Sequence, residues 1–267
     1  MLVRSRDGVE ISVQKSGSGL ALLLIHGSML NGALAWGRVL PQFAEHFTVY
    51  ALDRRGRAPS GDAKEYSLST EADDIAAVVE AIGQPATILS HSYGALATLE
   101  ALDRLTRIVQ LILYEPPVTL GPSGPESEKL VASMERALEA GDRGQVVTIF
   151  LRDQVGIPAE RLSGFQSSPI WPLVLPHAST LPREARSVNT YRSWDERLAK
   201  WKTPTTLLLG SETTGVLREG TMYLSRAIPA CRLVVLEGQG HGAPLDAPDY
   251  FVAKVLEVAL PATPSRS

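Results

Sequence analysis

The chain has 267 residues, of which 44% are hydrophobic and 21% charged, and its formal net charge at pH 7 is −3. These proportions exclude a wholly disordered chain, and the slightly acidic balance argues against a nucleic-acid binder, which needs a basic surface. A single cysteine, Cys231, cannot form an internal disulfide, and no group of Cys and His has zinc-site spacing, so we expect neither a metal nor a cofactor.

The longest apolar runs, Leu20–Ile25 and Thr205–Leu209, are far shorter than the roughly 20 residues that cross a bilayer. Arg4, Arg6 and Asp7 interrupt the N-terminus, so we expect no secretory signal. The default expectation is a cytoplasmic enzyme without membrane contact, although a processed precursor would look the same.

Short apolar runs alternate with helical patterns through the first 116 residues. Apolar residues recur at helical spacing in Ser69–Ile82 and Leu96–Leu105, and a last helix is expected near Ala247–Leu260, with Asp246 and Asp249 as its caps. The strands that we predict, in chain order, are Val9–Gln14 at a sheet edge, Ala21–Ile25, Thr48–Leu52, Thr87–Leu89, Gln110–Tyr114, Thr205–Leu209 and Arg232–Leu236. This alternation predicts an α/β fold with a parallel sheet covered by helices on both faces.

Residues 117–203, which we name the cap segment, do not follow this alternation of strand and helix patterns. They carry the helical patterns Glu126–Ala140 and Gln145–Gln154, and prolines mark both ends of the segment. Three of the four tryptophans fall within it: Trp171, Trp194 and Trp201. We predict a core formed by 1–116 and 204–260, a helical cap at 117–203 over the top edge of the sheet, and a disordered tail at 261–267. The alternative is that the cap segment forms ordinary surface helices.

The run Ser90-His91-Ser92-Tyr93-Gly94 lies between a buried strand and a helical pattern. A sharp strand-to-helix turn of this kind can hold a serine hydroxyl above the sheet, as in a nucleophile elbow. The turn needs small neighbours two positions before and after the serine; Gly94 meets this demand, and Ser90 stands where glycine is usual. We therefore predict Ser92 as a nucleophile, with an ordinary turn serine as the alternative.

The turn His26-Gly27-Ser28 directly follows the strand Ala21–Ile25. It can present the backbone N–H of Ser28 opposite that of Tyr93, and two converging donors would form an oxyanion hole. We expect His26 itself to be structural, bonded to the loop backbone.

Late in the chain, His241 lies in the glycine-rich run Gly238-Gln239-Gly240-His241-Gly242, just after a predicted strand. A neutral imidazole on such a loop could take the Ser92 proton and return it to a leaving group. A surface loop histidine is the alternative.

These motifs occur in the order typical of the α/β-hydrolase superfamily, and the chain resembles that superfamily from about Val9 to Leu260. The matching residues are His26-Gly27, the stretch from Asp53 to Ser60, the Ser92 elbow and Gly240-His241. The resemblance implies the α/β-hydrolase fold, with a mostly parallel twisted sheet and a helical cap. It leaves the substrate open, although a serine at position 92 makes dehalogenase and epoxide-hydrolase chemistry unfavourable, since those relatives use a carboxylate there.

The catalytic acid is where the sequence departs from this pattern. Most relatives carry an aspartate three residues after the glycine that ends the strand before the last; here that glycine is Gly210, and the position is Thr213. Glu115 ends a strand that should lie about 4.8 Å from the one bearing Ser92, and some members of the superfamily keep their acid there. Glu212 is offset by one residue, which in extended chain points its side chain the other way. We favour Glu115 and keep Glu212 as the alternative.

Together these residues predict a serine hydrolase that cleaves a carboxylic ester, lactone or thioester of a small, partly apolar molecule through an acyl-enzyme. Four aromatic residues of the cap segment are candidates for the substrate pocket: Trp171, Trp194, Phe165 and Tyr191. The alternatives are a carbon–carbon hydrolase or lyase that uses the same site, and a non-catalytic ligand-binding member of the fold. A small-molecule substrate is the expected partner, and a homodimer is possible in principle.

Overall fold

The structure is a computed structural model, and it describes residues 1–121, 124–192 and 195–260. The predicted disordered tail, 261–267, lies outside the described residues.

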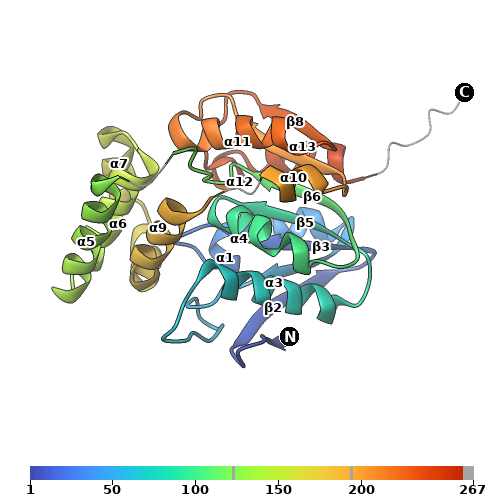
Figure 1. The fold of residues 1–267 in the computed structure, drawn as a ribbon, viewed down its shortest axis with the longest axis horizontal. Helices are drawn as coiled ribbons and strands as arrows, with labels where there is room; N and C mark the ends of the chain where they lie inside the picture. The colour runs from blue at the N-terminus through green and yellow to red at the C-terminus, as the bar shows by residue number, and fades with distance from the viewer. Residues whose placement is uncertain (122–123, 193–194, 261–267) are drawn as a thin grey trace, which may run out of the picture.

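Eight strands of the described chain form one sheet in the order β1-β2-β4-β3-β5-β6-β7-β8. β1 and β2 pair antiparallel, as do β2 and β4, whereas every other neighbouring pair is parallel. The strands are β1 (Leu2–Arg4), β2 (Glu10–Gly17), β3 (Leu20–Ile25), β4 (Phe47–Leu52), β5 (Ala86–His91), β6 (Ile108–Tyr114), β7 (Thr205–Gly210) and β8 (Cys231–Leu236). The carboxyl ends of the parallel strands therefore meet at one edge of the sheet (Figure 1).

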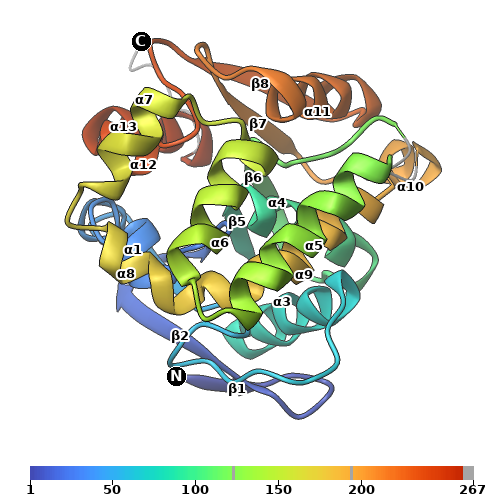
Figure 2. The ribbon, with the colours of Figure 1, turned by 90° about the vertical axis from the view of Figure 1, so that its left-hand side faces the viewer.

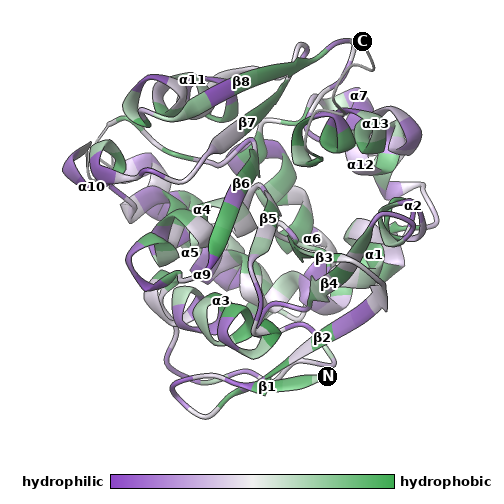
Figure 3. Ribbon diagram, turned by 90° about the vertical axis from the view of Figure 1, so that its right-hand side faces the viewer, coloured by the Kyte–Doolittle hydropathy of each residue, from purple (hydrophilic) through white to green (hydrophobic). Residues whose placement is uncertain are grey.

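Side chains of alternate residues in the inner strands belong to two separate hydrophobic clusters, one on each face of the sheet. Along β3, Leu22 and Leu24 enter one cluster, whereas Leu23 and Ile25 enter the other, as the twofold side-chain period of a strand requires. Residues of α1 (Gly32–Trp36), α2 (Leu40–Ala44), α12 (Ala243–Asp246) and α13 (Pro248–Ala259) pack into the first cluster. Residues of α3 (Leu68–Ile82), α4 (Tyr93–Ala101) and α11 (Gly215–Ala227) pack into the second. Figure 3 shows mostly hydrophobic residues in the central strands between these layers. The mostly parallel sheet with helices on both faces confirms the α/β architecture that we predicted.

Helices also fill the connection from β6 to β7. They are α5 (Pro125–Glu139), α6 (Arg143–Ile149), the π-helical turn η2 (Phe150–Val155), α7 (Ala159–Gln166), α8 (Trp171–Val174), the 3-10 turn η3 (Leu175–Thr180), α9 (Leu181–Thr190) and α10 (Asp195–Lys200). Most of them gather on one side of the molecule, with α5, α6 and α9 side by side (Figure 2). Their apolar interior, which includes Met134 and Val147, is continuous with the first cluster of the sheet. The division into core and cap therefore stays a prediction.

Three expectations from the sequence differ from the structure. Val9–Gln14 is not at the sheet edge, because the short strand β1 covers the outer side of β2. The helix predicted at Leu96–Leu105 begins earlier, at Tyr93, and ends in a 3-10 turn, η1 (Leu102–Arg104). Neither Asp246 nor Asp249 caps α13, because Ala247 is the N-cap residue and has no side-chain acceptor.

A network of buried charges joins the core to α9. The Arg54 guanidinium donates to both carboxylate oxygens of Glu71 at 2.6 Å and to Glu184 Oε1 at 2.8 Å. Arg57 lies 2.6 Å from the same Glu184 oxygen, and all four side chains are at most 2% exposed. Since Glu184 belongs to α9 whereas the arginines follow β4, this network fixes α9 against the sheet.

Replacing Glu184 with Gln should destabilise the fold by about 3–5 kcal/mol, because it leaves the Arg54 and Arg57 charges buried without their shared counter-ion. Urea unfolding followed by circular dichroism measures this loss. Glu135→Gln is the matched control, since the Glu135–Arg186 pair is about half exposed and its loss should change stability by less than about 1 kcal/mol. Equal losses in the two variants would contradict the structural role of the buried network.

No helix of the described chain combines the length and the hydrophobicity that crossing a bilayer requires.

Candidate active site

Ser92 lies at the sharp turn between β5 and α4. Its backbone angles, φ 54° and ψ −123°, fall in a strained region for a residue with a side chain. The chain tolerates the turn because its neighbours are small: a Cβ at Gly94 would lie 2.4 Å from the His26 carbonyl oxygen, and one at Gly27 would lie 2.9 Å from Ser92 Cβ. This geometry lifts the Ser92 side chain above the sheet edge at the start of a helix.

Two backbone N–H groups flank this serine. Ser28 follows β3, Tyr93 opens α4, and both line the same cavity as Ser92. Within the described residues, neither N–H donates to a protein acceptor. Because the first N–H groups of a helix have no partner inside the helix, the Tyr93 N–H also carries the positive end of the α4 dipole.

Buried polar groups hold the turn that carries Ser28. His26 Nε2 accepts from the Arg54 N–H at 3.1 Å, and its Nδ1 lies 2.8 Å from the Gly27 carbonyl oxygen. Burial lowers the pKa of His26 well below its usual value, which keeps the ring neutral. Arg54 also donates to the Gly27 carbonyl at 3.1 Å, and its guanidinium lies 4.4 Å from the centre of the Tyr93 ring. His26 is thus bonded to loop backbone, as we expected from the sequence.

Glu115 follows β6 and is fully buried beside the glycine loop that carries His241. Its positive φ of 48° turns the carboxylate away from the line of the strand. Oε1 accepts from the Gly210 N–H at 2.7 Å and from the Thr213 hydroxyl at 2.6 Å. Oε2 lies 2.5 Å from His241 Nδ1. Thr213, at the position where the sequence pattern led us to expect an acid, therefore holds the Glu115 carboxylate in place.

Glu212 makes no side-chain hydrogen bond to this imidazole in the described chain. Its side chain is 52% exposed and pairs with Arg161 at 3.3 Å. Of the two candidate carboxylates, only Glu115 contacts His241.

The side chains of His91 and Tyr114 hold the loop that bears His241. His91 Nε2 lies 3.0 Å from the His241 carbonyl oxygen, and the Tyr114 hydroxyl donates to the Gly240 carbonyl. The His91 and Tyr114 rings stack at 4.9 Å, and burial lowers the pKa of His91 well below its usual value. Neither residue was expected from the sequence to have a role. Each directly precedes a predicted site residue, Ser92 or Glu115, and that adjacency is the signal by which sequence reasoning could have found them.

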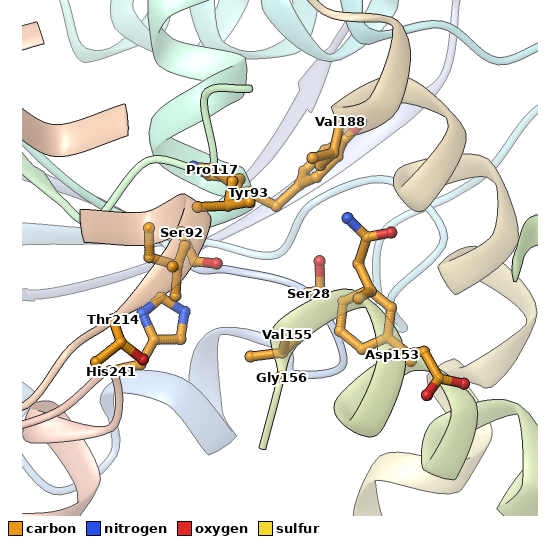
Figure 4. A pocket seen from close by; sticks show the side chains of 15 residues that line it. Ser28, Ser92, Tyr93, Pro117, Asp153, Val155, Gly156, Val188, Thr214 and His241 are labelled. Atoms are coloured by element: carbon orange, nitrogen blue, oxygen red, sulfur yellow. The ribbon is translucent and has the colours of Figure 1, made fainter. Parts of the chain in front are cut away.

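A cavity of about 290 Å³ brings these elements together. Ser92 and His241 lie next to each other on one side of it, and Asp153 lies on the other (Figure 4). Most of its wall is apolar, from Pro117, Phe150, Val155, Val188, Val216 and Leu217. The π-helical turn η2 supplies Phe150, Asp153, Gln154 and Val155 of the wall, in keeping with the frequent occurrence of π-helical turns at functional sites.

Three of the four aromatic residues predicted for the pocket, Phe165, Trp171 and Tyr191, do not line this cavity. Phe165 and Trp171 pack edge to face on each other, with ring centres 5.9 Å apart, and lie partly buried against the first hydrophobic cluster. Tyr191 is 6% exposed and belongs to the second hydrophobic cluster. Their apolar surface is used for packing, and other apolar residues, Phe150 among them, line the cavity instead. Trp194 lies outside the described residues.

Nowhere in the ranges 1–121, 124–192 and 195–260 do three or more His, Cys, Asp or Glu side chains gather in a group that could hold a metal ion.

The chain is similar to known proteins over most of its length. The model of the alpha/beta hydrolase family matches residues 22–254. The crystal structure of an alpha/beta hydrolase from Sphaerobacter thermophilus superposes with a TM-score of 0.85, at 32% identity, over 96% of this chain and 99% of that chain. A pimeloyl-[acyl-carrier protein] methyl ester esterase from Aeromonas hydrophila is 26% identical over 91% of this chain and 97% of its own length. A non-heme chloroperoxidase from Kitasatospora aureofaciens is 28% identical, over 89% of this chain and 90% of its own.

Proposed function

The chain belongs to the alpha/beta hydrolase family, and from this premise we propose that it is a serine hydrolase that cleaves a carboxylic ester, lactone or thioester of a small, partly apolar molecule. Its relatives include a methyl ester esterase, which supports a hydrolase of this class. The proposed catalytic residues are Ser92, His241 and Glu115, with the N–H groups of Ser28 and Tyr93 as the oxyanion hole.

The observation that carries the proposal is the contact between the buried carboxylate of Glu115 and His241, which lines the same cavity as Ser92. Because Oε2 of the carboxylate accepts from Nδ1–H at 2.5 Å, the neutral imidazole keeps a lone pair on Nε2. That lone pair can accept the Ser92 hydroxyl proton, and Glu115 stabilises the positive charge that the ring then gains.

In the first step, the Ser92 oxygen bonds to the carbonyl carbon while its proton passes to His241 Nε2. The electron pair of the C=O bond moves to oxygen, where the N–H groups of Ser28 and Tyr93 stabilise the charge; loss of one such donor typically costs about 3–4 kcal/mol. As the carbonyl re-forms, the bond to the leaving alcohol or thiol breaks, and His241 protonates that group.

In the second step, water attacks the acyl-enzyme and gives its proton to His241, which then protonates the Ser92 oxygen as the acid leaves. The apolar wall of the 290 Å³ cavity suits an apolar group next to the reacting carbonyl.

Two measurements on the purified protein test this function together: turnover of p-nitrophenyl esters and intact mass after treatment with a fluorophosphonate. We expect ester hydrolysis to fall in proportion to the fraction of protein that gains one phosphonyl group. A labelled protein that hardly turns over esters would instead favour a carbon–carbon hydrolase or lyase, and neither labelling nor turnover would favour a non-catalytic protein.

A further inference from the structure

The loop that bears His241 has few backbone bonds of its own. Gly240 and Gly242 flank the histidine, so no side chain on either neighbour restricts the backbone there. At Gly240 and His241, no backbone N–H or C=O takes part in a backbone–backbone hydrogen bond within residues 1–121, 124–192 and 195–260. The backbone of the loop therefore does not fix the imidazole by itself, and side chains from other elements must do so.

His91 and Tyr114 donate to two successive carbonyls of this loop. His91 Nε2 lies 3.0 Å from the His241 carbonyl oxygen, and because a carbonyl can only accept, this nitrogen carries the proton. The Tyr114 hydroxyl donates to the Gly240 carbonyl. Burial lowers the pKa of His91 and raises that of Tyr114, so both remain neutral donors. The two carbonyls belong to the peptide groups on either side of the His241 Cα, so these bonds fix the direction in which the imidazole leaves the backbone.

The His91 ring also contacts the imidazole of His241 directly. The two ring centres lie 4.5 Å apart with an angle of 44° between the ring planes, and the His91 ring stacks on Tyr114 at 4.9 Å. His91 thus joins Tyr114 and His241 into one packed group of rings. Because packed side chains leave little free space, this contact restricts rotation of the His241 ring about its side-chain bonds.

The register of two parallel strands brings both donors to this point. His91 directly precedes Ser92 at the end of β5, and Tyr114 directly precedes Glu115 at the end of β6. His91 and Tyr114 are partners in the ladder between these strands, and the Ser92 N–H donates to the Tyr114 carbonyl at 2.8 Å. The strand ends that place the proposed nucleophile and acid therefore also place the two donors to the loop of the proposed base.

We propose that His91 and Tyr114 are positioning residues of the proposed serine hydrolase, which hold the His241 imidazole beside the nucleophile through the two loop carbonyls. This inference rests on the proposed function and assigns the device that orients its base. Neither residue lines the cavity that holds Ser92, so neither is placed to touch a substrate there. Their loss should therefore slow the proton transfer, which lowers kcat, and leave KM nearly unchanged.

The test compares three variants by steady-state hydrolysis of p-nitrophenyl esters and by the rate of fluorophosphonate labelling. Tyr114→Phe removes only the hydroxyl and should lower kcat and the labelling rate by about tenfold, with KM within about twofold of the wild type. His91→Leu removes a donor and should cause a loss of at least similar size. His91→Gln keeps a side-chain N–H donor at similar reach, so it should recover most of the kcat that His91→Leu loses.

Phe251→Leu is the matched control for packing, because the buried Phe251 ring lies 5.5 Å from the Tyr114 ring and bonds neither loop carbonyl. It should lower the unfolding temperature and leave kcat within about twofold, whereas Tyr114→Phe should unfold near the wild-type temperature. A wild-type kcat in Tyr114→Phe, or equal losses in His91→Leu and His91→Gln, would overturn the positioning role while wild-type turnover stands. Wild-type protein that neither hydrolyses esters nor gains a label would instead overturn the proposed function.

Discussion

Ser92→Ala should abolish fluorophosphonate labelling and lower kcat for p-nitrophenyl esters by at least about 10⁴-fold. The strained turn between β5 and α4 presents the Ser92 side chain beside His241 at the cavity wall, and the methyl group of alanine cannot form the acyl bond. Slow hydrolysis above the rate in water should remain, because the oxyanion donors and the cavity persist. Intact mass and steady-state kinetics measure both effects.

Ser90→Ala supplies the control from the same turn. The Ser90 side chain is fully buried, and its hydroxyl has no hydrogen-bond partner within the described chain, so alanine there removes a hydroxyl of the same kind without touching the cavity. This variant should keep its labelling and most of its activity. Labelling that persists in Ser92→Ala would place the nucleophile on another residue.

Much of the fold follows from the sequence because the inner strands are buried on both faces. The continuous apolar run of β3 and the helical spacing in α3 are strong signals that local reasoning detects. β1 was missed because three residues, Leu2–Arg4, are too short to show a period, and only pairing with β2 defines them. The prediction that β2 lies at the sheet edge was wrong because β1, which covers its outer side, was missed.

Some residues of the candidate site could be predicted from the sequence, and others could not. Ser92 and His241 stand out because glycines and strand ends mark their loops, whereas the contact between Glu115 and Thr213 depends on how β6 and β7 align across the sheet. Phe165 and Trp171 lie outside the Ser92 cavity because their rings pack on each other and against the first hydrophobic cluster, a use of apolar surface that is common for Phe and Trp in a small helical layer. Local sequence does not distinguish a side chain that faces a cavity from one that faces a neighbouring helix.

Glu115→Gln should lower kcat by about 10³- to 10⁴-fold while leaving the protein folded. The Gly210 N–H and the Thr213 hydroxyl both donate to Oε1, so the amide oxygen of the glutamine should stay there and its NH₂ group should face His241. The NH₂ group can only donate, which forces the imidazole proton from Nδ1 onto Nε2. His241 then cannot accept the Ser92 proton, and steady-state kinetics with a thermal unfolding control measure the loss.

Two further variants separate this role from a structural one. Glu212→Gln should change kcat by less than about twofold, because the Glu212 side chain pairs with Arg161 at a half-exposed site. In the otherwise unchanged protein, Thr213→Asp should lower activity, because it places a second carboxylate beside buried Glu115. In the Glu115→Gln variant, the same substitution should raise activity by about tenfold or more, because it restores a negative charge near His241. If the role of Glu115 were purely structural, Thr213→Asp would not change from lowering activity to raising it when Glu115 is replaced. A greater loss of kcat in Glu212→Gln than in Glu115→Gln would assign the acid to Glu212.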